Sequence, residues 1–329
     1  MDIIKVGIPR ALLYYQYYPM WESFFEKLGA EVVVSPLTNK AILNLGVTRA
    51  VADTCLPVKL FLGHVISLID KCDYIFAPTV ISLGRKAYNC SKIIGLPNMT
   101  RALIPECPVI LAPEINLEKW RYHVYQNIYK LGSCFTSNPF KIKKAVEEAW
   151  KSNLAYRSKM AHEGITCPEA INRMCQTNQQ LDSNCYPSPI LTIAVIGHPY
   201  VLYDDYLNHR LISRLKSMGV KVLVPEMAAE EELDIAAKKM VGTPHWSFET
   251  DIVGAGEYYM EEKVDGIINL SVFGCGPDSM MVDFVKHRAR EFGIPFLALS
   301  LDEHASEGGV LTRLEAFLDM IKRRNRICV

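Results

Sequence analysis

Two stretches of the sequence decide the fold, because they read as copies of one unit: DIIKVGIPRALLYYQYYPMWESFFEKLGAEVVVSPL at residues 2–37 and LTIAVIGHPYVLYDDYLNHRLISRLKSMGVKVLVPE at residues 191–226. Each copy predicts an apolar strand, a turn with the pattern Gly-x-Pro, a tyrosine-rich helix and a second strand. Apolar, β-branched strands that alternate with helices are typical of parallel sheets covered by helices on both faces. The repeat therefore predicts an α/β fold of two doubly wound, Rossmann-like parallel-sheet domains.

The likeness of the two halves continues along the chain. We expect a buried strand that runs into a loop in KCDYIFAPTVISLG at residues 71–84 and in KVDGIINLSVFGCG at residues 263–276. A further strand follows in each half, in CPVILAPEI at residues 107–115 and in IPFLALSLDE at residues 294–303. Ligands of open α/β sheets bind beyond the carboxyl ends of the strands, so we expect the chemistry at that edge.

The middle of the chain has a different pattern. Residues 116–189 predict helices and then a polar linker that carries Pro187 and Pro189. We therefore expect an N-terminal α/β domain at residues 1–115, a helical insert and linker, and a C-terminal α/β domain at residues 190–329.

The composition argues against several classes of protein. Half of the 329 residues are apolar and 22% are charged, which is typical of a globular chain. Lysine and arginine (36) balance aspartate and glutamate (36), and we interpret the basic run Lys322–Arg326 as a solvated helix end. No apolar run reaches the ~18 residues of a membrane span, and no signal peptide is evident. We expect a cytoplasmic protein with neither nucleic acid nor a membrane as partner.

Three of the ten cysteines fall at the predicted carboxyl edge. Cys55 stands two residues before Pro57 at the start of a predicted amphipathic helix, where free N–H groups favour a thiolate. Cys90 lies in the loop after the strand DYIFAPTVI, and Cys275 lies between two glycines in the equivalent loop of the second half. Three thiolates from two domains suit a soft metal centre such as an iron–sulfur cluster, and buried structural cysteines are the alternative.

The other cysteines are expected to be incidental thiols. Zinc sites usually show close C-x-x-C pairs, which this sequence lacks. The seven positions are Cys72, Cys107, Cys134, Cys167, Cys175, Cys185 and Cys328.

The residues of these blocks carry a resemblance to a known family. GIPRALLYYQYYPMWESFFEKLGAEVVVSP, CLPVKLFLGHV and DYIFAPTVISL resemble the uncharacterised domain of large CoA-substrate-specific enzyme activases, which is related to the 2-hydroxyacyl-CoA dehydratase superfamily. FGCGPDSMMVDFV and DEHASEGGVLTRLEAFLDMI resemble the C-terminal half of that superfamily. The resemblance implies a [4Fe-4S] cluster in the cleft between the domains, with Cys55, Cys90 and Cys275 as its ligands.

The resemblance also implies an activity and a partner. Dehydratases of this superfamily eliminate water from 2-hydroxyacyl-CoA through a ketyl radical, and relatives with a double-cubane cluster reduce small molecules. Both depend on a separate ATP-dependent activator or reductase. The chain itself shows neither a phosphate-binding P-loop motif nor a G-x-G-x-x-G fingerprint. The oligomeric state stays open, with a homodimer as one alternative.

Three further residues are candidates for catalysis. Lys59 follows Cys55 by one helical turn and could offset the charge of a cluster. Arg10 and His198 end the first strand of each half, and a histidine titrates near neutrality. A solvated lysine is the alternative for Lys59, and His64 is expected to be an ordinary core or surface histidine.

Other polar residues near the predicted edge have two interpretations each. Arg85 and Lys86 could bind an anionic substrate or be solvated. Asp278 and Ser279 could donate or accept hydrogen bonds at a cluster, or cap a helix. Residues 302–304, Asp-Glu-His, could line the cleft or form a solvated turn.

The sequence thus supports three hypotheses of function. The first is a [4Fe-4S] protein that performs or assists low-potential one-electron reduction or dehydration of a small molecule or acyl-CoA. The second is a non-catalytic cluster carrier or electron-transfer partner of an activase-type enzyme. The third is a two-lobed ligand-binding module without metal, whose cysteines are incidental.

Overall fold

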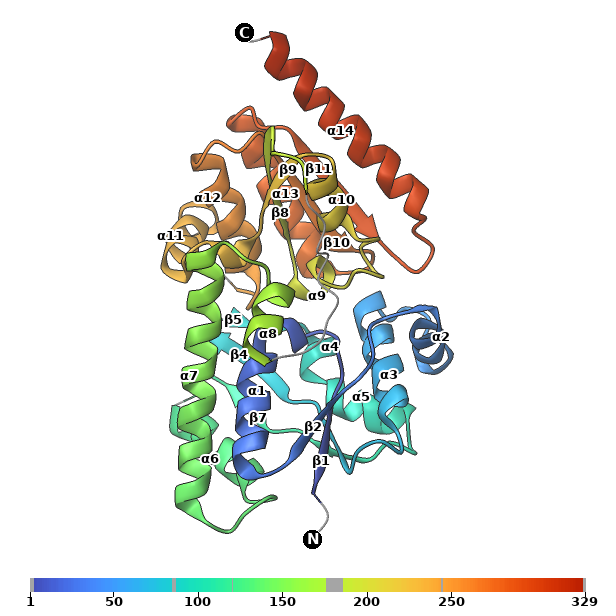
Figure 1. The fold of residues 1–329 in the computed structure, drawn as a ribbon, viewed down its shortest axis with the longest axis vertical. Coiled ribbons are helices and arrows are strands. Elements are labelled where there is room, and N and C mark those ends of the chain that lie inside the picture. Colours follow the sequence, from blue (N-terminus) through green and yellow to red (C-terminus); the bar gives the residue numbers. More distant parts are fainter. Residues whose placement is uncertain (1–2, 85–86, 120, 176–185, 244, 328–329) are drawn as a thin grey trace. The chain divides into compact units, whose positions relative to one another are not determined.

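The computed structural model describes residues 3–84, 87–119, 121–175, 186–243 and 245–327 (Figure 1). The chain divides into two compact units. Unit 1 comprises Met1–Gln179 with His245–Ser247, and unit 2 comprises Gln180–Pro244 with Phe248–Val329. The finer division into a domain ending at residue 115 and an insert at residues 116–189 stays a prediction.

Unit 1 is built on a parallel sheet of the order β2-β1-β3-β6. The register sets Val6 beside Val32 and Tyr74, and these apolar strands are covered by helices. The strands are β1 (Lys5–Ile8), β2 (Glu31–Val34), β3 (Tyr74–Phe76) and β6 (Val109–Leu111).

Two predicted strands of unit 1 are each broken by an Ala-Pro pair. Ala77-Pro78 separates β3 from β4 (Thr79–Gly84), and Ala112-Pro113 separates β6 from β7 (Glu114–Asn116). Proline has no N–H to give to a sheet, so the ladder ends there. The chain then continues in a small second sheet of the order β5-β4-β7, with β5 at Ala87–Tyr88. His245–Ser247 joins unit 1 here, because the Tyr88 N–H donates to the His245 carbonyl oxygen at 2.9 Å.

Eight helices appear in the described part of unit 1. The longest, α7, lies along α1 (Figure 1), and the Tyr156 hydroxyl donates to the Tyr15 carbonyl oxygen at 2.6 Å. The helices are α1 (Tyr14–Leu28), α2 (Lys40–Arg49), α3 (Leu56–Leu68), α4 (Ser91–Ile94), α5 (Leu96–Leu103), α6 (Arg121–Gly132), α7 (Pro139–Glu163) and α8 (Cys167–Cys175).

Helix α3 is buried on nearly all sides, so the prediction of an amphipathic helix is wrong. All of its residues except Ile66 and Ser67 are buried. The reason is its contact with α2, where a Cβ on Gly63 would lie 2.0 Å from the Ile42 carbonyl oxygen and one on Gly46 would lie 1.8 Å from the Lys59 carbonyl oxygen. The two helix backbones touch at these glycines, and this contact fixes the position of α3.

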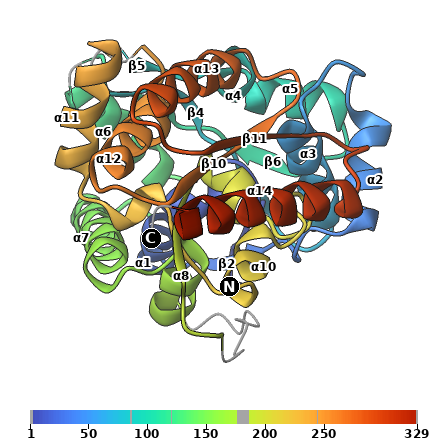
Figure 2. The same cartoon turned by 90° about the horizontal axis from the view of Figure 1, so that it is seen from above.

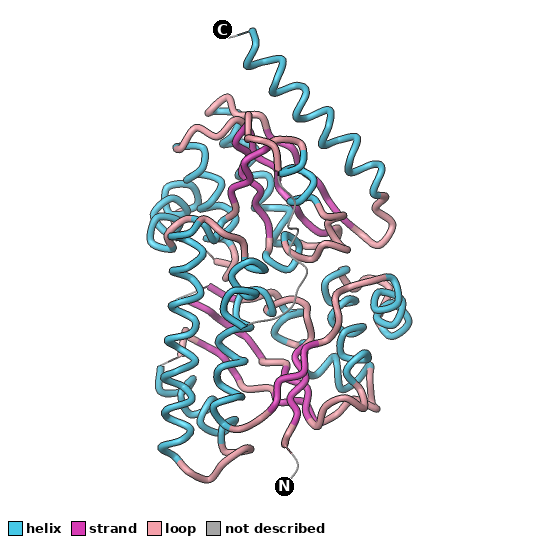
Figure 3. The backbone as a smooth tube through the Cα atoms, in the orientation of Figure 1, coloured by secondary structure: helices cyan, strands magenta, loops and turns pink. Residues whose placement is uncertain are grey.

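Unit 2 repeats the strand order of unit 1. Its parallel sheet runs β9-β8-β10-β11, which in chain order is the same 2-1-3-4 pattern as β2-β1-β3-β6. Figure 3 shows the strands of each unit in magenta, with helices in cyan around them. The two doubly wound sheets predicted from the repeat are therefore confirmed. The strands are β8 (Leu191–Gly197), β9 (Val220–Leu223), β10 (Gly266–Val272) and β11 (Phe296–Leu301).

Helices cover both faces of the sheet in unit 2. Figure 2 shows α13 and α14 on opposite sides of β10 and β11, and Gly266 of β10 packs against Phe317 and Ile321 of α14. The helical elements are α9 (Pro199–Leu202), α10 (Leu211–Ser217), the 3-10 helix η1 (Pro225–Met227), α11 (Glu230–Val241), the π-helix η2 (Thr250–Gly254), α12 (Ala255–Glu261), α13 (Gly276–Glu291) and α14 (Glu307–Ile327). Among the described residues, no helix combines the length and apolar character that a bilayer span requires.

The tyrosine-rich helix predicted for the second copy is not continuous. It is interrupted between α9 and α10, where Asp204 Oδ1 accepts from the backbone N–H groups of Tyr206 and Leu207. Next, His209 and Arg210 both adopt positive φ angles of 55° and 58°. A short polar side chain that satisfies nearby N–H groups competes with helix formation, which explains the break.

Candidate metal centre

The strand order of each unit reverses at one point of the sheet. In unit 1 this point lies between β1 and β3, and in unit 2 it lies between β8 and β10. Ligands of doubly wound sheets bind at the carboxyl edge at this point. Arg10 follows β1, His198 follows β8, and Cys275 follows β10. Each of these residues therefore stands at the switch point of its own unit.

The three cysteines predicted as ligands occupy the same kind of position. Cys55 is the N-cap of α3, Cys90 is the N-cap of α4, and Cys275 is the N-cap of α13. All three are half-buried. A helix start offers unpaired N–H groups and a positive dipole end, both of which stabilise a thiolate.

Cys55 and Cys90 lie close enough in unit 1 to influence each other. Burial raises the pKa of Cys55 above its ordinary value, and the neighbouring Cys90 adds to this rise. The Lys92 ammonium and the Val58 backbone N–H act in the opposite direction and lower the same pKa. Lys92 Nζ also donates to the Asp53 carbonyl oxygen at 3.3 Å, which ties the start of α4 to the segment before α3.

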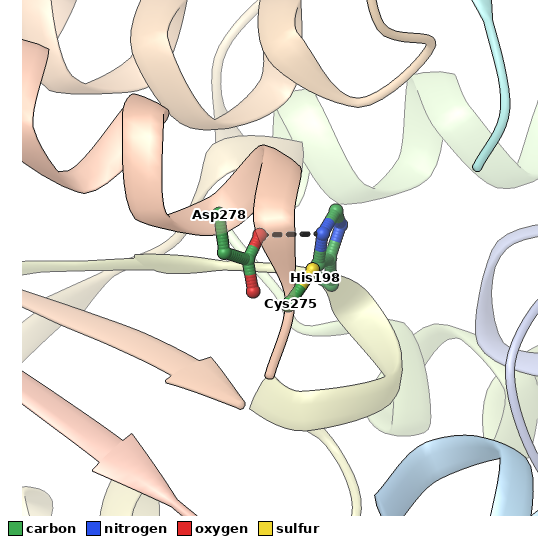
Figure 4. Close-up of side chains that lie close together, drawn as sticks. All are labelled: His198, Cys275 and Asp278. Atoms are coloured by element: carbon green, nitrogen blue, oxygen red, sulfur yellow. Dashed lines mark ion pairs between the residues drawn. The ribbon is translucent and has the colours of Figure 1, made fainter. Parts of the chain in front are cut away.

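Cys275 has a different set of neighbours in unit 2. His198 Nε2 lies 2.7 Å from Asp278 Oδ1, and both side chains are almost completely buried (Figure 4). The His198 ring stacks on Tyr200 at a centroid distance of 4.8 Å and meets the edge of Phe248 at 4.9 Å. These rings fix the orientation of the imidazole.

A close approach of two strands brings His198 to this place. Gly197 ends β8 with a φ of 157°, and a Cβ there would lie 2.4 Å from the Leu270 carbonyl oxygen of β10. Only glycine allows the backbone so near. Since β8 and β10 are neighbours in the sheet, His198 emerges beside the start of α13, which carries Asp278 one turn after Cys275.

The donor atoms of His198, Cys275 and Asp278 fit a metal ion. One nitrogen, one sulfur and one oxygen lie within 4.8 Å of one another. His198 Nδ1 and Asp278 Oδ2 are buried without a hydrogen-bond partner among the described residues. This mixed donor set suits borderline-soft divalent ions such as Zn²⁺ and Fe²⁺. The thiols of Cys55 and Cys90 fit iron–sulfur ligation, and because they belong to unit 1, their meeting with Cys275 stays a prediction.

The two predicted basic residues of unit 1 are buried. Lys59 is 5% exposed and Arg10 is 8% exposed, so the alternative of a solvated Lys59 is wrong. His64 is a core residue, as expected, and its ring nitrogens lie 2.9 Å from Ser35 Oγ and 3.0 Å from Thr38 Oγ1. The roles of Lys59, Arg10 and His198 in catalysis stay predictions.

The remaining polar candidates differ in their surroundings. The His304 backbone N–H donates to Asp302 Oδ1 at 2.9 Å in an exposed segment, which supports the solvated-turn interpretation. The Ser279 hydroxyl donates to the Cys275 carbonyl oxygen at 2.9 Å, as expected within a first helical turn. Arg85 and Lys86 lie outside the described residues.

The other cysteines have surroundings that disfavour ligation. Burial raises the pKa of Cys72 and of Cys107 to about 11, and both precede strands and so lie near the amino edge. Burial and a hydrogen bond with Glu22 raise the pKa of Cys175. Cys134 is exposed and Cys167 is buried, whereas Cys185 and Cys328 lie outside the described residues.

Sequence reasoning missed the convergence of His198 with Asp278. Both residues were identified as candidates, but separately. A signal was present in the repeat, because the two strands that precede them correspond to neighbouring strands of a doubly wound sheet. Their carboxyl ends share one edge, so a side chain after each can meet there.

Comparison with known families agrees with this architecture. The family model described as CoA enzyme activase uncharacterised domain (DUF2229) matches residues 5–228, more than half of the chain. The model described as 2-hydroxyglutaryl-CoA dehydratase, D-component, matches residues 218–321. No curated protein matches the chain. The chain therefore belongs to the CoA enzyme activase uncharacterised-domain family, within the 2-hydroxyacyl-CoA dehydratase and activase group that its sequence resembles.

Proposed function

We propose that the chain is an iron–sulfur protein in which Cys55, Cys90 and Cys275 hold one [4Fe-4S] cluster. The observation that carries this proposal is the shared position of the three cysteines, each of which occupies the N-cap position of a helix. Three protein ligands would leave one iron free to bind a substrate, and such a cluster supplies single electrons at low potential. The function is then to perform or assist one-electron reduction or dehydration of a small substrate.

The residues around the thiols suit this role. The N–H groups at the three helix starts and the ammonium group of Lys92 offset the negative charge that thiolate ligation brings. His198 stands beside Cys275 and is oriented by Tyr200, so it can hold a proton near a substrate bound at that edge.

The family suggests the partner and the substrate class. An activase-related domain points to a separate ATP-dependent activator that delivers the electron, and to an acyl-CoA ester or another small molecule as substrate. Such chemistry belongs to an anaerobic cytoplasm, because a reduced cluster with an open iron reacts with oxygen.

The proposal is tested by iron and sulfide quantification after anaerobic purification. The wild type is expected to carry about four irons and matching sulfide per chain, and Cys55→Ser, Cys90→Ser and Cys275→Ser are each expected to lose most of them. Cys134→Ser is the matched control, since this thiol is exposed in unit 1 and away from a strand end. An iron-free wild type, or serine variants with full iron, would contradict the proposal.

Spectroscopy separates an enzyme from an electron carrier. A substrate that binds an open iron changes the EPR spectrum of the reduced cluster. We expect such a change with one member of a panel of acyl-CoA esters and small acids. Unchanged spectra across the panel favour the carrier.

A second candidate is a mononuclear metal site in unit 2 alone. It is favoured by the donor atoms of His198, Cys275 and Asp278 within 4.8 Å and by the buried polar atoms that lack partners. Such a protein would bind about one zinc or iron without sulfide, as a three-ligand site with an open position does. Metal content would then fall in Asp278→Asn and stay unchanged in Cys55→Ser and Cys90→Ser.

A further inference from the structure

Arg10 is a buried cation, and one nitrogen of its guanidinium group has no hydrogen-bond partner among the described residues. Its Nε donates to the Ser35 carbonyl oxygen at 3.3 Å, and its guanidinium lies 5.1 Å from the centroid of the Tyr14 ring. Its Nη1 is buried and has no hydrogen-bond partner among the described residues. A guanidinium removed from water without a partner is costly, so a native structure that keeps one at a ligand-binding edge calls for an explanation.

No carboxylate compensates this charge within unit 1. Among the described residues of the unit, every aspartate and glutamate is at least partly exposed, and none forms an ion pair with Arg10. The buried basic and histidine side chains of the described part of unit 1 are Arg10, Lys59 and His64. Burial lowers the pKa of His64 to about 3, and the nearby Arg10 contributes to this fall, so the imidazole is neutral at physiological pH. The buried charge of unit 1 is therefore positive.

The position of Arg10 matches that of a ligand site. It follows β1 at the switch point of the sheet, and its backbone N–H donates to Ser35 Oγ at 2.8 Å, which fixes it to the end of β2. The Tyr14 ring beneath the guanidinium also lines an apolar cavity of about 40 Å³, together with Ile8, Phe61 and Phe76. These apolar neighbours cannot neutralise the guanidinium.

We infer that Arg10 binds an oxyanion, the carboxylate or phosphate group of a small ligand, at the carboxyl edge of β1. A planar guanidinium with a free edge binds two oxygens of such a group in parallel. This site goes beyond the proposed function, because it lies in unit 1 and needs neither iron nor Cys275.

Calorimetric titration of the anaerobically purified full chain tests the inference, with inorganic phosphate and butyrate as the two probes. We expect saturable binding of at least one probe, and which one binds identifies the source of the oxyanion. Arg10→Gln is expected to weaken this binding about tenfold or more, because a charge-assisted hydrogen-bond pair is lost. Arg49→Gln is the matched control, since Arg49 is a half-exposed arginine of unit 1 paired with Glu106, and its binding should equal that of the wild type.

A second variant and a second measurement guard against misfolding and against binding at iron. Arg10→Lys keeps the charge but not the two-pronged geometry, and it should bind more weakly than the wild type and more tightly than Arg10→Gln. The bound probe should raise the melting temperature of the wild type but not of Arg10→Gln. Failure of both probes to bind the wild type, or equal binding by Arg10→Gln, overturns the inference. Loss of binding in the iron-depleted Cys90→Ser variant would also overturn it, because the anion would then sit on the cluster.

Discussion

Units 1 and 2 share one strand order, yet the charged side chains buried in them differ in sign. Among the described acidic, basic and histidine side chains, those buried in unit 1 are Arg10, Lys59 and a neutral His64. In unit 2 they are chiefly carboxylates, and most of these have partners. Glu257 pairs with Arg288 at 2.9 Å through both oxygens, and Asp204 accepts from two backbone N–H groups.

The repeat therefore explains the shared strand order of the two units, but it does not explain the chemistry of the side chains that each unit carries. In both units a strand, a turn and a helix start meet at the switch point, and the side chains placed there decide what binds. Unit 1 offers a guanidinium and two thiols, which suit an anion and iron. Unit 2 offers an imidazole, a thiol and a carboxylate, which suit a cation.

The largest effect is expected from a substitution that disturbs the packing of unit 1 alone. Gly63→Ala places a Cβ 2.0 Å from the Ile42 carbonyl oxygen, so α3 must move away from α2. We expect a loss of about 3 kcal/mol in the free energy of unfolding. Urea denaturation followed by tryptophan fluorescence measures it, because the described tryptophans, Trp21, Trp150 and Trp246, lie in unit 1.

The control for this change is a glycine with free space around it. Gly164 ends α7 with a φ of 60° and would meet nothing within 4 Å. Gly164→Ala should therefore cost only about 1 kcal/mol, from backbone strain alone. If both variants lose the same stability, the α2–α3 contact does not fix the carboxyl edge of unit 1.

In unit 2, we expect a comparable loss of stability when the Asp278 carboxylate is removed. Asp278→Ala removes the buried partner of His198 and should destabilise the metal-free protein by about 3 kcal/mol. Hydrogen exchange of the β8 and β10 amides measures this loss in unit 2. Asp283→Ala, on an exposed position of the same helix, should leave exchange unchanged. Exchange at the wild-type rate in both variants would show that the pair of His198 and Asp278 does not stabilise unit 2.

The neutral His64 makes the stability of unit 1 depend on pH. Its pKa is about 3 in the folded chain and about 6.5 in the unfolded chain, so the unfolded chain takes up a proton first as the pH falls. The stability from a neutral His64 is complete above pH 6.5 and is lost progressively toward pH 3. We expect a loss of about 2 kcal/mol between pH 7 and pH 5 from this residue.

The measurement is the difference in unfolding free energy between the wild type and His64→Gln across this pH range. His287→Gln is the control, because His287 is exposed on α13. A difference that does not change with pH for His64→Gln would mean that the folded chain protonates this ring as readily as the unfolded chain does.

The sequence predicted the elements that depend on local patterns. The repeat predicted two parallel sheets, and the Cys-x-Pro pattern predicted the helix start at Cys55. Local chemistry was enough in these cases, because strand periodicity and a proline in the first turn act over a few residues.

The sequence did not predict the features that depend on tertiary packing. The burial of Arg10 and Lys59 departs from the usual exposure of basic residues and follows from tertiary packing around them. The meeting of His198 with Asp278 depends on the adjacency of β8 and β10 and on the close approach at Gly197. The Ala-Pro breaks were readable in principle, since proline ends a ladder, but the strong apolar runs around them outweighed that signal.

The smallest expected effect concerns a helix that unit 1 has and unit 2 lacks among its described residues. Asn138 caps α7, and its Oδ1 accepts from the backbone N–H groups of Phe140 at 3.0 Å and Lys141 at 3.4 Å. Asn138→Ala should cost about 1 kcal/mol, whereas Asn138→Ser keeps a capping oxygen and should cost much less. Because α7 packs along α1 and carries Trp150, the loss should appear in the fluorescence transition and not in the hydrogen exchange of β8 and β10. An equal loss in both variants would assign the stability of α7 to its packing on α1 alone.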